Sequence, residues 1–229
     1  NVDLKLGNHG NSHRDFKLAS KLSLGDDCTL ELVSPDGTRL DLSDRLNDVG
    51  YAPTEGYWTT RIAVREPGLY IVGHSLDRVV NHGRPIRSIK SGKTCFVASA
   101  SLDQVSQENS GFDRSLGYAL ELTPITNPVT PMGPGSPISI RLTWRGQPLA
   151  NEKLSFIPRG TTLAEGFDAT YERTTDSAGA ASFTPTIGQT YLVVAHKLAE
   201  DERGPDYEAT SYSATLTVFV PDVCPCCAP

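Results

Sequence analysis

Positive charge, methionine and long apolar segments are all scarce in this sequence. Its 229 residues include one methionine and 21 Lys or Arg residues against 27 Asp or Glu residues, so the formal net charge is −6. Nucleic-acid binding needs clustered Lys and Arg side chains for phosphate contacts, so we expect no nucleic-acid partner. No apolar run reaches the ~18 to 20 residues that span a bilayer, so we expect no transmembrane segment in the given chain.

Sequence patterns of the common catalytic folds are missing as well. The chain contains no Gly-x-Ser-x-Gly nucleophile turn, no His-Glu-x-x-His pair and no Gly-rich phosphate loop that opens a helix. Asp26 and Asp27 form an isolated acidic pair, which is more typical of a turn than of a general acid and base. We therefore expect a protein that is not an enzyme and has no catalytic residues.

What the chain does contain is alternation of apolar and polar residues. Residues 58–64, 138–144 and 214–220 each alternate with a period of two, which indicates half-buried β-strands. No stretch of ten or more residues has an apolar stripe at helical spacing. The 20 glycines and 16 prolines fall largely between the alternating runs, where they favour turns. The sequence thus predicts an all-β fold.

A polar, strandless stretch near the middle of the chain divides it. We predict an N-terminal β-sandwich at 1–100, a polar linker at 101–117, a C-terminal immunoglobulin-like β-sandwich at 118–221 and a cysteine-rich tail at 222–229. Seven strands are expected in the second sandwich, at 118–123, 138–144, 153–157, 171–175, 180–184, 190–196 and 211–220. Two tandem sandwiches of immunoglobulin-like or transthyretin-like type are therefore the expected architecture.

An ordered set of phrases in the sequence resembles a known family. The phrases are LELTPITNP at 120–128, WRGQPLANEKLSF at 144–156, TTDSAGAASFTP at 174–185, TYLVVAHK at 190–197 and YSATLTVFV at 212–220. They resemble a bacterial family of exported two-domain β-sandwich proteins of unknown function, formerly described as NikM-like periplasmic components of nickel or cobalt uptake. SPDGTRLDL, EPGLYIVGHS and SIKSGKTCFVAS in the first half match this family more loosely.

The resemblance implies an exported, non-catalytic protein in the periplasm or at the cell surface. It supplies no established active-site residues that could be transferred to this chain. Two departures stand out. Members of the family usually begin with a segment of His and aromatic residues and one more strand before the position of residues 2–6, and they do not generally end in a cysteine cluster.

Three cysteines close together in the tail are the most distinctive chemical feature. Cys224, Cys226 and Cys227 carry soft thiol ligands that suit a transition metal ion. Their spacing differs from the paired Cys-x2–4-Cys arrangement of structural zinc sites, and no His follows as in haem attachment. In an oxidising compartment they could instead form disulfides within the chain or with a neighbour, or the tail could be disordered.

The other two cysteines, Cys28 and Cys95, lie on predicted strands of the first half. They are either two buried small hydrophobic residues or a disulfide across the first sandwich. If they pair, three cysteines remain for the tail, and at least one of those is left for a metal, a free thiol or another chain.

Four histidines form a second candidate metal set. His9 and His13 lie in GNHGNSH, and His74 and His82 lie in GHSLDRVVNH, so the two segments could converge. Two or three imidazoles would suit Ni, Co, Cu or Zn. The alternative is that each histidine is simply solvated in its own loop.

Four cations recur at three-residue steps between 84 and 93. Arg84, Arg87, Lys90 and Lys93 would not share one face of a strand, because side chains alternate. We interpret them as a solvated rim, with an anionic partner as the less favoured alternative.

Two hypotheses for function follow. The first is a non-catalytic exported binding or accessory protein, with a transition metal ion as candidate ligand. The second is a structural subunit of an extracellular or surface assembly, joined to a protein partner or to other copies of itself. The absent leading strand motivates the second, because an incomplete sheet edge can accept a strand from another chain, and the cysteine tail could then link neighbours.

Overall fold

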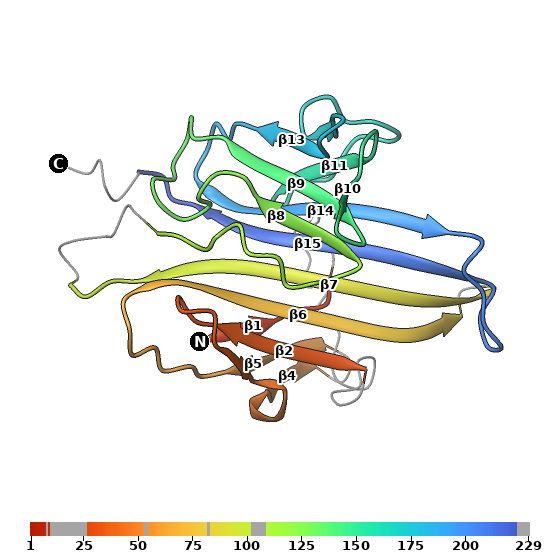
Figure 1. The fold of residues 1–229 in the computed structure, drawn as a ribbon, viewed down its shortest axis with the longest axis horizontal. Coiled ribbons are helices and arrows are strands. Elements are labelled where there is room, and N and C mark those ends of the chain that lie inside the picture. Colours follow the sequence, from red (N-terminus) through yellow and green to blue (C-terminus); the bar gives the residue numbers. More distant parts are fainter. Residues whose placement is uncertain (8, 10–26, 53–54, 82, 102–108, 224–229) are drawn as a thin grey trace.

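The computed structural model describes residues 1–7, 9, 27–52, 55–81, 83–101 and 109–223 (Figure 1). These residues form β-strands and one short 3-10 helix, Ser43–Arg45, without any α-helix, which confirms the all-β prediction. The strands are β1 Val2–Leu4, β2 Cys28–Val33, β3 Arg39–Asp41, β4 Asn47–Ala52, β5 Glu55–Thr60, β6 Gly68–Asn81, β7 Pro85–Ala98, β8 Leu120–Pro124, β9 Ile138–Trp144, β10 Gln147–Pro148, β11 Lys153–Pro158, β12 Glu172–Thr174, β13 Ala180–Phe183, β14 Gln189–Ala199 and β15 Ala209–Val220.

One large sheet runs through the whole molecule. Its eight strands lie in the order β12-β11-β14-β15-β7-β6-β2-β3, so strands from both halves of the chain share it (Figure 1). The halves meet where β15 pairs with β7, and this pairing is parallel, whereas the other pairs in the sheet are antiparallel. The division into separate domains at 1–100 and 118–221 stays a prediction, and the sheet crosses it without a break.

Two smaller sheets pack on opposite faces of the large sheet. A four-stranded sheet, with β9 paired to β8, β10 and β13, covers the C-terminal half on one face. The alternate residues of β15 that include Leu216 and Val218 are buried in the core beneath it. A three-stranded sheet, β1-β5-β4, covers the N-terminal half on the other face. Its core contains Leu30 and Val72, and Trp58 is completely buried nearby.

The described part of the expected linker packs against the large sheet. Glu121 on β8 accepts hydrogen bonds from the Ser115 hydroxyl and from the Leu116 and Gly117 backbone N–H groups, and it forms a buried ion pair with Lys93 on β7. Leu116 is itself buried against the sheet. Residues 115–117 are therefore packed against the fold, because Glu121 holds them in place.

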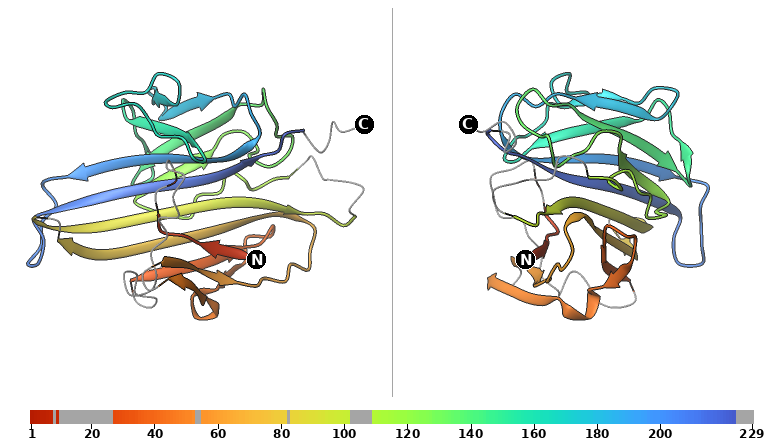
Figure 2. Two further views of the ribbon diagram at one scale, coloured as in Figure 1. Left: turned by 180° about the vertical axis from the view of Figure 1, so that it is seen from behind. Right: turned by 60° about the vertical axis from the view of Figure 1, so that its left-hand side comes forward.

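This arrangement leaves part of one sheet face without a covering sheet. On the face that carries β1-β5-β4, that small sheet packs over β2 and β6, while no strand among the described residues covers β15, β14 and β11. Figure 2 shows the two small sheets on opposite sides of the large one. The uncovered area is the place to search for a site.

Candidate functional site

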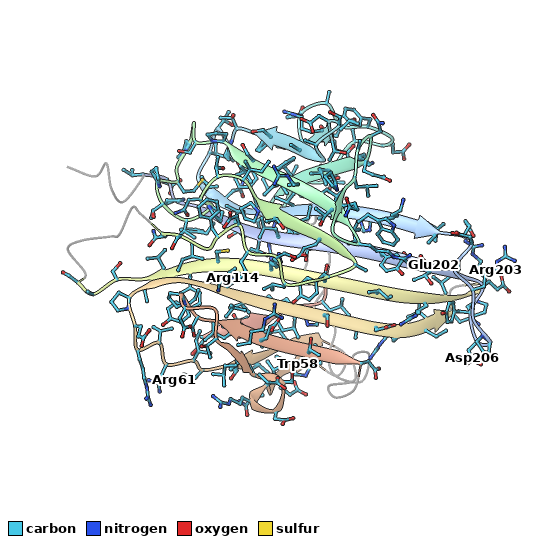
Figure 3. All side chains as sticks on the ribbon, viewed as in Figure 1. Trp58, Arg61, Arg114, Glu202, Arg203 and Asp206 are labelled. Atoms are coloured by element: carbon cyan, nitrogen blue, oxygen red, sulfur yellow. The ribbon has the colours of Figure 1, made fainter. Side chains whose placement is uncertain are left out.

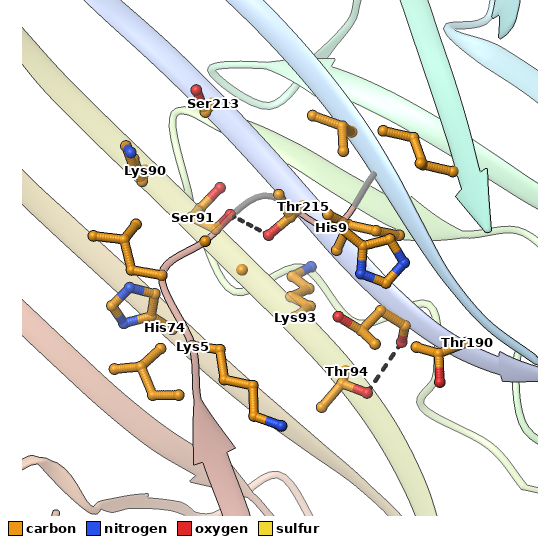
Figure 4. Close-up of a pocket in the computed structure, with 18 of the residues that line it drawn as sticks. Lys5, His9, His74, Lys90, Ser91, Lys93, Thr94, Thr190, Ser213 and Thr215 are labelled. Atoms are coloured by element: carbon orange, nitrogen blue, oxygen red, sulfur yellow. Dashed lines mark hydrogen bonds between the residues drawn. The ribbon is translucent and has the colours of Figure 1, made fainter. Parts of the chain in front are cut away.

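A groove of about 960 Å³ lies on this uncovered face, at the junction of the two halves (Figure 4). Its floor is the surface of β6, β7, β15, β14 and the end of β11, and residues 2–7 form one wall. Successive side chains of a strand point to opposite faces, yet all three residues of β1 line the groove, so the backbone edge of β1 faces it. Among the described residues, β1 pairs only with β5.

Strand register decides which side chains of the floor lie side by side. Residues that are Cα partners point to the same face of a sheet. Three rows therefore cross the floor over β6, β7, β15 and β14: Leu76, Lys90, Ser213 and His196; His74, Gly92, Thr215 and Val194; and Val72, Thr94, Thr217 and Leu192. The first two rows hold the titratable groups, and the third adds apolar surface.

Gly92 lies on the floor of the groove without a side chain. It lies between His74 and Thr215, and a Cβ built on it would meet the Thr215 Oγ1 at 3.1 Å and His74 carbon atoms at 3.9 Å. A glycine in the interior of a strand weakens the strand, and it often marks a place where a ligand or another backbone approaches closely. Gly92 therefore leaves strand backbone on the floor between two groove side chains.

Lys90 is the cation nearest the centre of the floor. Burial lowers its pKa, and the positive charge of Arg78 lowers it further. No carboxylate among the described residues forms an ion pair with it. Lys93, three residues later on the same strand, points to the opposite face and has Glu121 as its counter-charge.

His74 is fixed by the backbone of the neighbouring strand. Its Nδ1 lies 2.8 Å from the Thr29 carbonyl oxygen, so Nδ1 carries the proton and donates it. In the neutral ring Nε2 is then an acceptor, and it becomes a donor only when the ring is protonated. Burial is the main cause that lowers the pKa of His74, and Lys90 adds to it.

His196 and His9 lie on the other side of the floor. The Nδ1 of His196 lies 2.9 Å from the Ser213 Oγ, and desolvation together with Lys90 and Lys153 lowers the pKa of His196. Burial and the nearby Arg159 lower the pKa of His9, whose Nε2 is buried without a hydrogen-bond partner among the described residues. Near neutral pH these imidazoles are therefore largely uncharged.

The described residues do not fit a metal site in this groove. No group of three or more His, Cys, Asp or Glu side chains in the described part of the chain is arranged to hold a metal ion. Lys90 lies between His74 and His196 in the register of the floor, and its ammonium group would repel a metal cation. The structure therefore brings His9 and His74 to one groove without forming a shared ligand set.

Five of the predicted metal-binding residues lie outside the described residues. They are His13, His82, Cys224, Cys226 and Cys227. Nothing in the structure bears on them, and their metal-binding or disulfide role stays a prediction.

Cys28 and Cys95 are free thiols in the structure. Strand β6 lies between their strands, and their partners on β6 are Leu76 and Ile71, five positions apart. At about 3.3 Å per residue this offset alone is about 17 Å, far beyond the ~7 Å limit for the Cα atoms of a disulfide. The fold therefore keeps the two thiols apart and does not form the bridge across the first sandwich. Burial raises the pKa of Cys28, and it raises that of Cys95 to about 12.

Sequence reasoning missed two residues at the centre of the groove, Lys90 and Gly92. The interpretation of residues 84–93 as a solvated rim is wrong for Lys93, which is buried, and Lys90 is partly buried as well. A glycine between two lysines inside an otherwise strand-like run was the available signal. It could not be interpreted without knowing that β15, from the far end of the chain, lies beside it.

Three further findings concern membrane spans and similar proteins. In the described part of the chain, no helical segment has the length and apolar character that a bilayer crossing demands. A comparison with curated proteins finds no match. Residues 1–198 match the family model described as a domain of unknown function, DUF4198, and the chain therefore belongs to that family.

Proposed function

We propose that this protein is a non-catalytic, exported binding or accessory protein, and that the groove on the large sheet is its ligand site. The observation that carries the proposal is the position of the groove. Small sheets or residues 109–117 pack on other parts of the large sheet, whereas no strand among the described residues covers the area that His74, Lys90 and His196 line. Concave sites with a few convergent polar groups on an apolar floor are typical of ligand binding.

Binding fits this chemistry better than catalysis. The Thr94 and Thr215 hydroxyls donate to backbone carbonyls of the neighbouring strand, which commits their protons to the fold. The Ser213 and His196 side chains are in contact, but Lys90 and Lys153 beside this histidine make it a weaker base. A serine nucleophile needs an effective base that a third group orients. Burial and the two cations instead lower the pKa of His196, so it is a poor base for Ser213.

The proposal is tested with a pair of bulky substitutions. Thr217→Trp places an indole over the floor of the groove, and Arg141→Trp places one on the exposed outer face of β9 as the matched control. The ligands are the chlorides of Ni, Co, Cu and Zn, inorganic phosphate, succinate and neutral sugars, each measured by thermal shift and calorimetry.

At least one ligand should stabilise the wild-type protein and Arg141→Trp but fail to stabilise Thr217→Trp. Circular dichroism should show the same β content in all three proteins. A panel in which nothing binds, or in which binding survives Thr217→Trp, contradicts the proposal.

A structural role is the second candidate, and the edge of β1 favours it. This strand has a partner on only one side among the described residues, and its other edge faces the groove. An unpaired edge presents backbone donors and acceptors that an added strand can satisfy. Sizing of the full chain, with reducing and non-reducing gels, should then show assemblies larger than one chain. A monomer under all conditions contradicts this role.

A further inference from the structure

We infer that the floor of the groove around Gly92 is an anion site, which takes a carboxylate or phosphate group of a small ligand with Lys90 as its main cationic partner and His74 and His196 as flanking donors. This inference rests on the proposed function and adds the chemical class of the ligand. It follows from how the fold treats charge, space and proton donors around this one position.

The charge argument compares two lysines of one strand. Lys93 and Lys90 are both desolvated, on opposite faces of β7. The fold supplies Lys93 with the carboxylate of Glu121. Among the described residues it supplies Lys90 with none, and the charged neighbour that acts on the pKa of Lys90 is a cation, Arg78. Burying a charge without a partner is costly. A bound anion would therefore neutralise Lys90 on this face, as Glu121 neutralises Lys93 on the other.

The remaining charges of the groove agree. Its described lining contains one acidic residue, Asp3, which forms an ion pair with Lys5 at the wall. Arg159 is a further lining cation. A cleft that is lined by one sign of charge concentrates ligands of the opposite sign. The positive charges of the groove would repel a metal cation at this position.

The space argument compares two glycines on neighbouring strands. A Cβ on Gly73 would lie 2.6 Å from Leu116 Cδ1 and 2.6 Å from the Tyr118 hydroxyl oxygen, so this glycine serves close packing inside the fold. At Gly92 the nearest atoms to a built Cβ are Thr215 Oγ1 at 3.1 Å and His74 carbon atoms at 3.9 Å, and both side chains line the groove. The first glycine is explained by packing inside the fold, whereas the second leaves backbone without a side chain on the floor beside Lys90, where a ligand can approach closely.

The donor argument concerns His74. Because its Nδ1 donates to the Thr29 carbonyl, Nε2 donates to a bound anion only after the ring gains a proton. The groups that face His74 are Lys90 and the Cys28 thiol, and those that face His196 are Lys90 and Lys153. Two cations, Lys90 and Lys153, and a neutral thiol keep the empty site unprotonated. An anion offsets those charges, so its binding should be accompanied by proton uptake.

The test measures the affinity of the whole protein for inorganic phosphate and for succinate by calorimetry. Lys90→Gln removes the charge, and Gly92→Ala keeps every charge but adds a methyl group to the floor of the groove. Arg61→Gln is the matched control, because Arg61 is an exposed cation on the segment after β5 and does not line the groove (Figure 3). Both groove variants should weaken binding at least tenfold, while the control should change it less than twofold.

A second readout separates a ligand contact from a merely structural effect. Titrations at pH 7 in two buffers of different ionisation enthalpy should show proton uptake in the wild-type protein and less uptake in His74→Gln. The probe that binds with the higher affinity, inorganic phosphate or succinate, identifies the ligand group as phosphate or carboxylate. Equal affinity in Lys90→Gln and wild type, or saturation by neither probe, overturns the anion site. Binding of a neutral sugar or a metal ion that Thr217→Trp abolishes would overturn it too, but would leave the binding function standing.

Discussion

Strand β7 carries two lysines that lie at least partly inside the molecule, and Lys93 is more deeply buried than Lys90. Its partner Glu121 also accepts hydrogen bonds from Ser115 and Leu116. Burial acts to raise the pKa of Glu121, but Lys93 and these hydrogen bonds lower it below its usual value. One carboxylate thus joins β7, β8 and residues 115–117.

Replacing this carboxylate should be strongly destabilising. Glu121→Gln leaves the Lys93 ammonium buried without a counter-charge, and removing one partner of a buried pair typically costs about 3 to 5 kcal/mol. The free energy of unfolding in urea measures the loss. Glu200→Gln, which removes one partner of the exposed pair with Arg84, is the control and should change stability far less. Equal losses in the two variants would contradict the structural role of Glu121.

The histidines of the groove should make stability depend on pH. Burial lowers the pKa of His74 and His196 from 6.5, so the folded protein binds protons less readily than the unfolded chain. Their contribution is therefore fully present above pH 6.5 and is lost as the pH falls through that value toward the lower folded-state pKa. Urea unfolding between pH 8 and pH 5 should show this decline, and His74→Gln should make it shallower. A slope that His74→Gln leaves unchanged would be the contrary result.

Single residues show where prediction from sequence stops. The period of two places Lys90 and Lys93 on opposite faces of a strand, and the structure confirms this. It could not indicate that both faces are covered, because the neighbouring strand β15 lies more than a hundred residues away. The surroundings of Gly92 include Thr215 of that strand, and they were beyond local reasoning for the same reason.

Among the elements, the strands with strict alternation were the most predictable. Residues 138–144 were expected as a strand and form β9 with the same bounds, and 153–157 and 211–220 fall within β11 and β15. The run at 58–64 was wrong in its second half, because β5 ends at Thr60. Beyond that residue no pairing partner continues among the described residues, and alternation alone does not reveal where a partner ends.

The packing of residues 115–118 on β6 gives a prediction at this scale. Gly73→Ala should loosen that contact, because its Cβ would lie 2.6 Å from Leu116 Cδ1 and from the Tyr118 hydroxyl. Overpacking of this kind typically costs about 1 to 3 kcal/mol, which urea unfolding would detect. Gly92→Ala is the comparison and should lose less stability, because its nearest contact is 3.1 Å rather than 2.6 Å. The reverse order of stability would contradict the assigned packing.

The whole molecule is organised around one continuous sheet, which bears on the predicted division into domains. The chain has two tryptophans, Trp58 in the core beneath the three-stranded sheet and Trp144 against the core beneath the four-stranded sheet. Each half therefore carries its own fluorescent probe. The sequence predicted the position of both residues on strands but not the sheet that connects them.

Unfolding should be one cooperative transition. In denaturant, the fluorescence of Trp58→Phe reports the C-terminal half and that of Trp144→Phe reports the N-terminal half. Their midpoints, each corrected for the stability of its variant by circular dichroism, should coincide, because separating the halves would break the β7–β15 ladder. Two separated transitions would instead support independent domains at 1–100 and 118–221.

The parallel pairing of β7 with β15 also fixes an order of events during synthesis. About 110 residues separate the end of β7 at Ala98 from the start of β15 at Ala209, a separation typical of slow, non-local pairing. While the ribosome makes the intervening chain, β7 has a neighbour on one side only and its other edge is open to unwanted strand partners. The N-terminal half therefore cannot finish folding until almost all of the described chain has emerged, so a premature stop before β15 leaves an aggregation-prone product rather than a smaller working one.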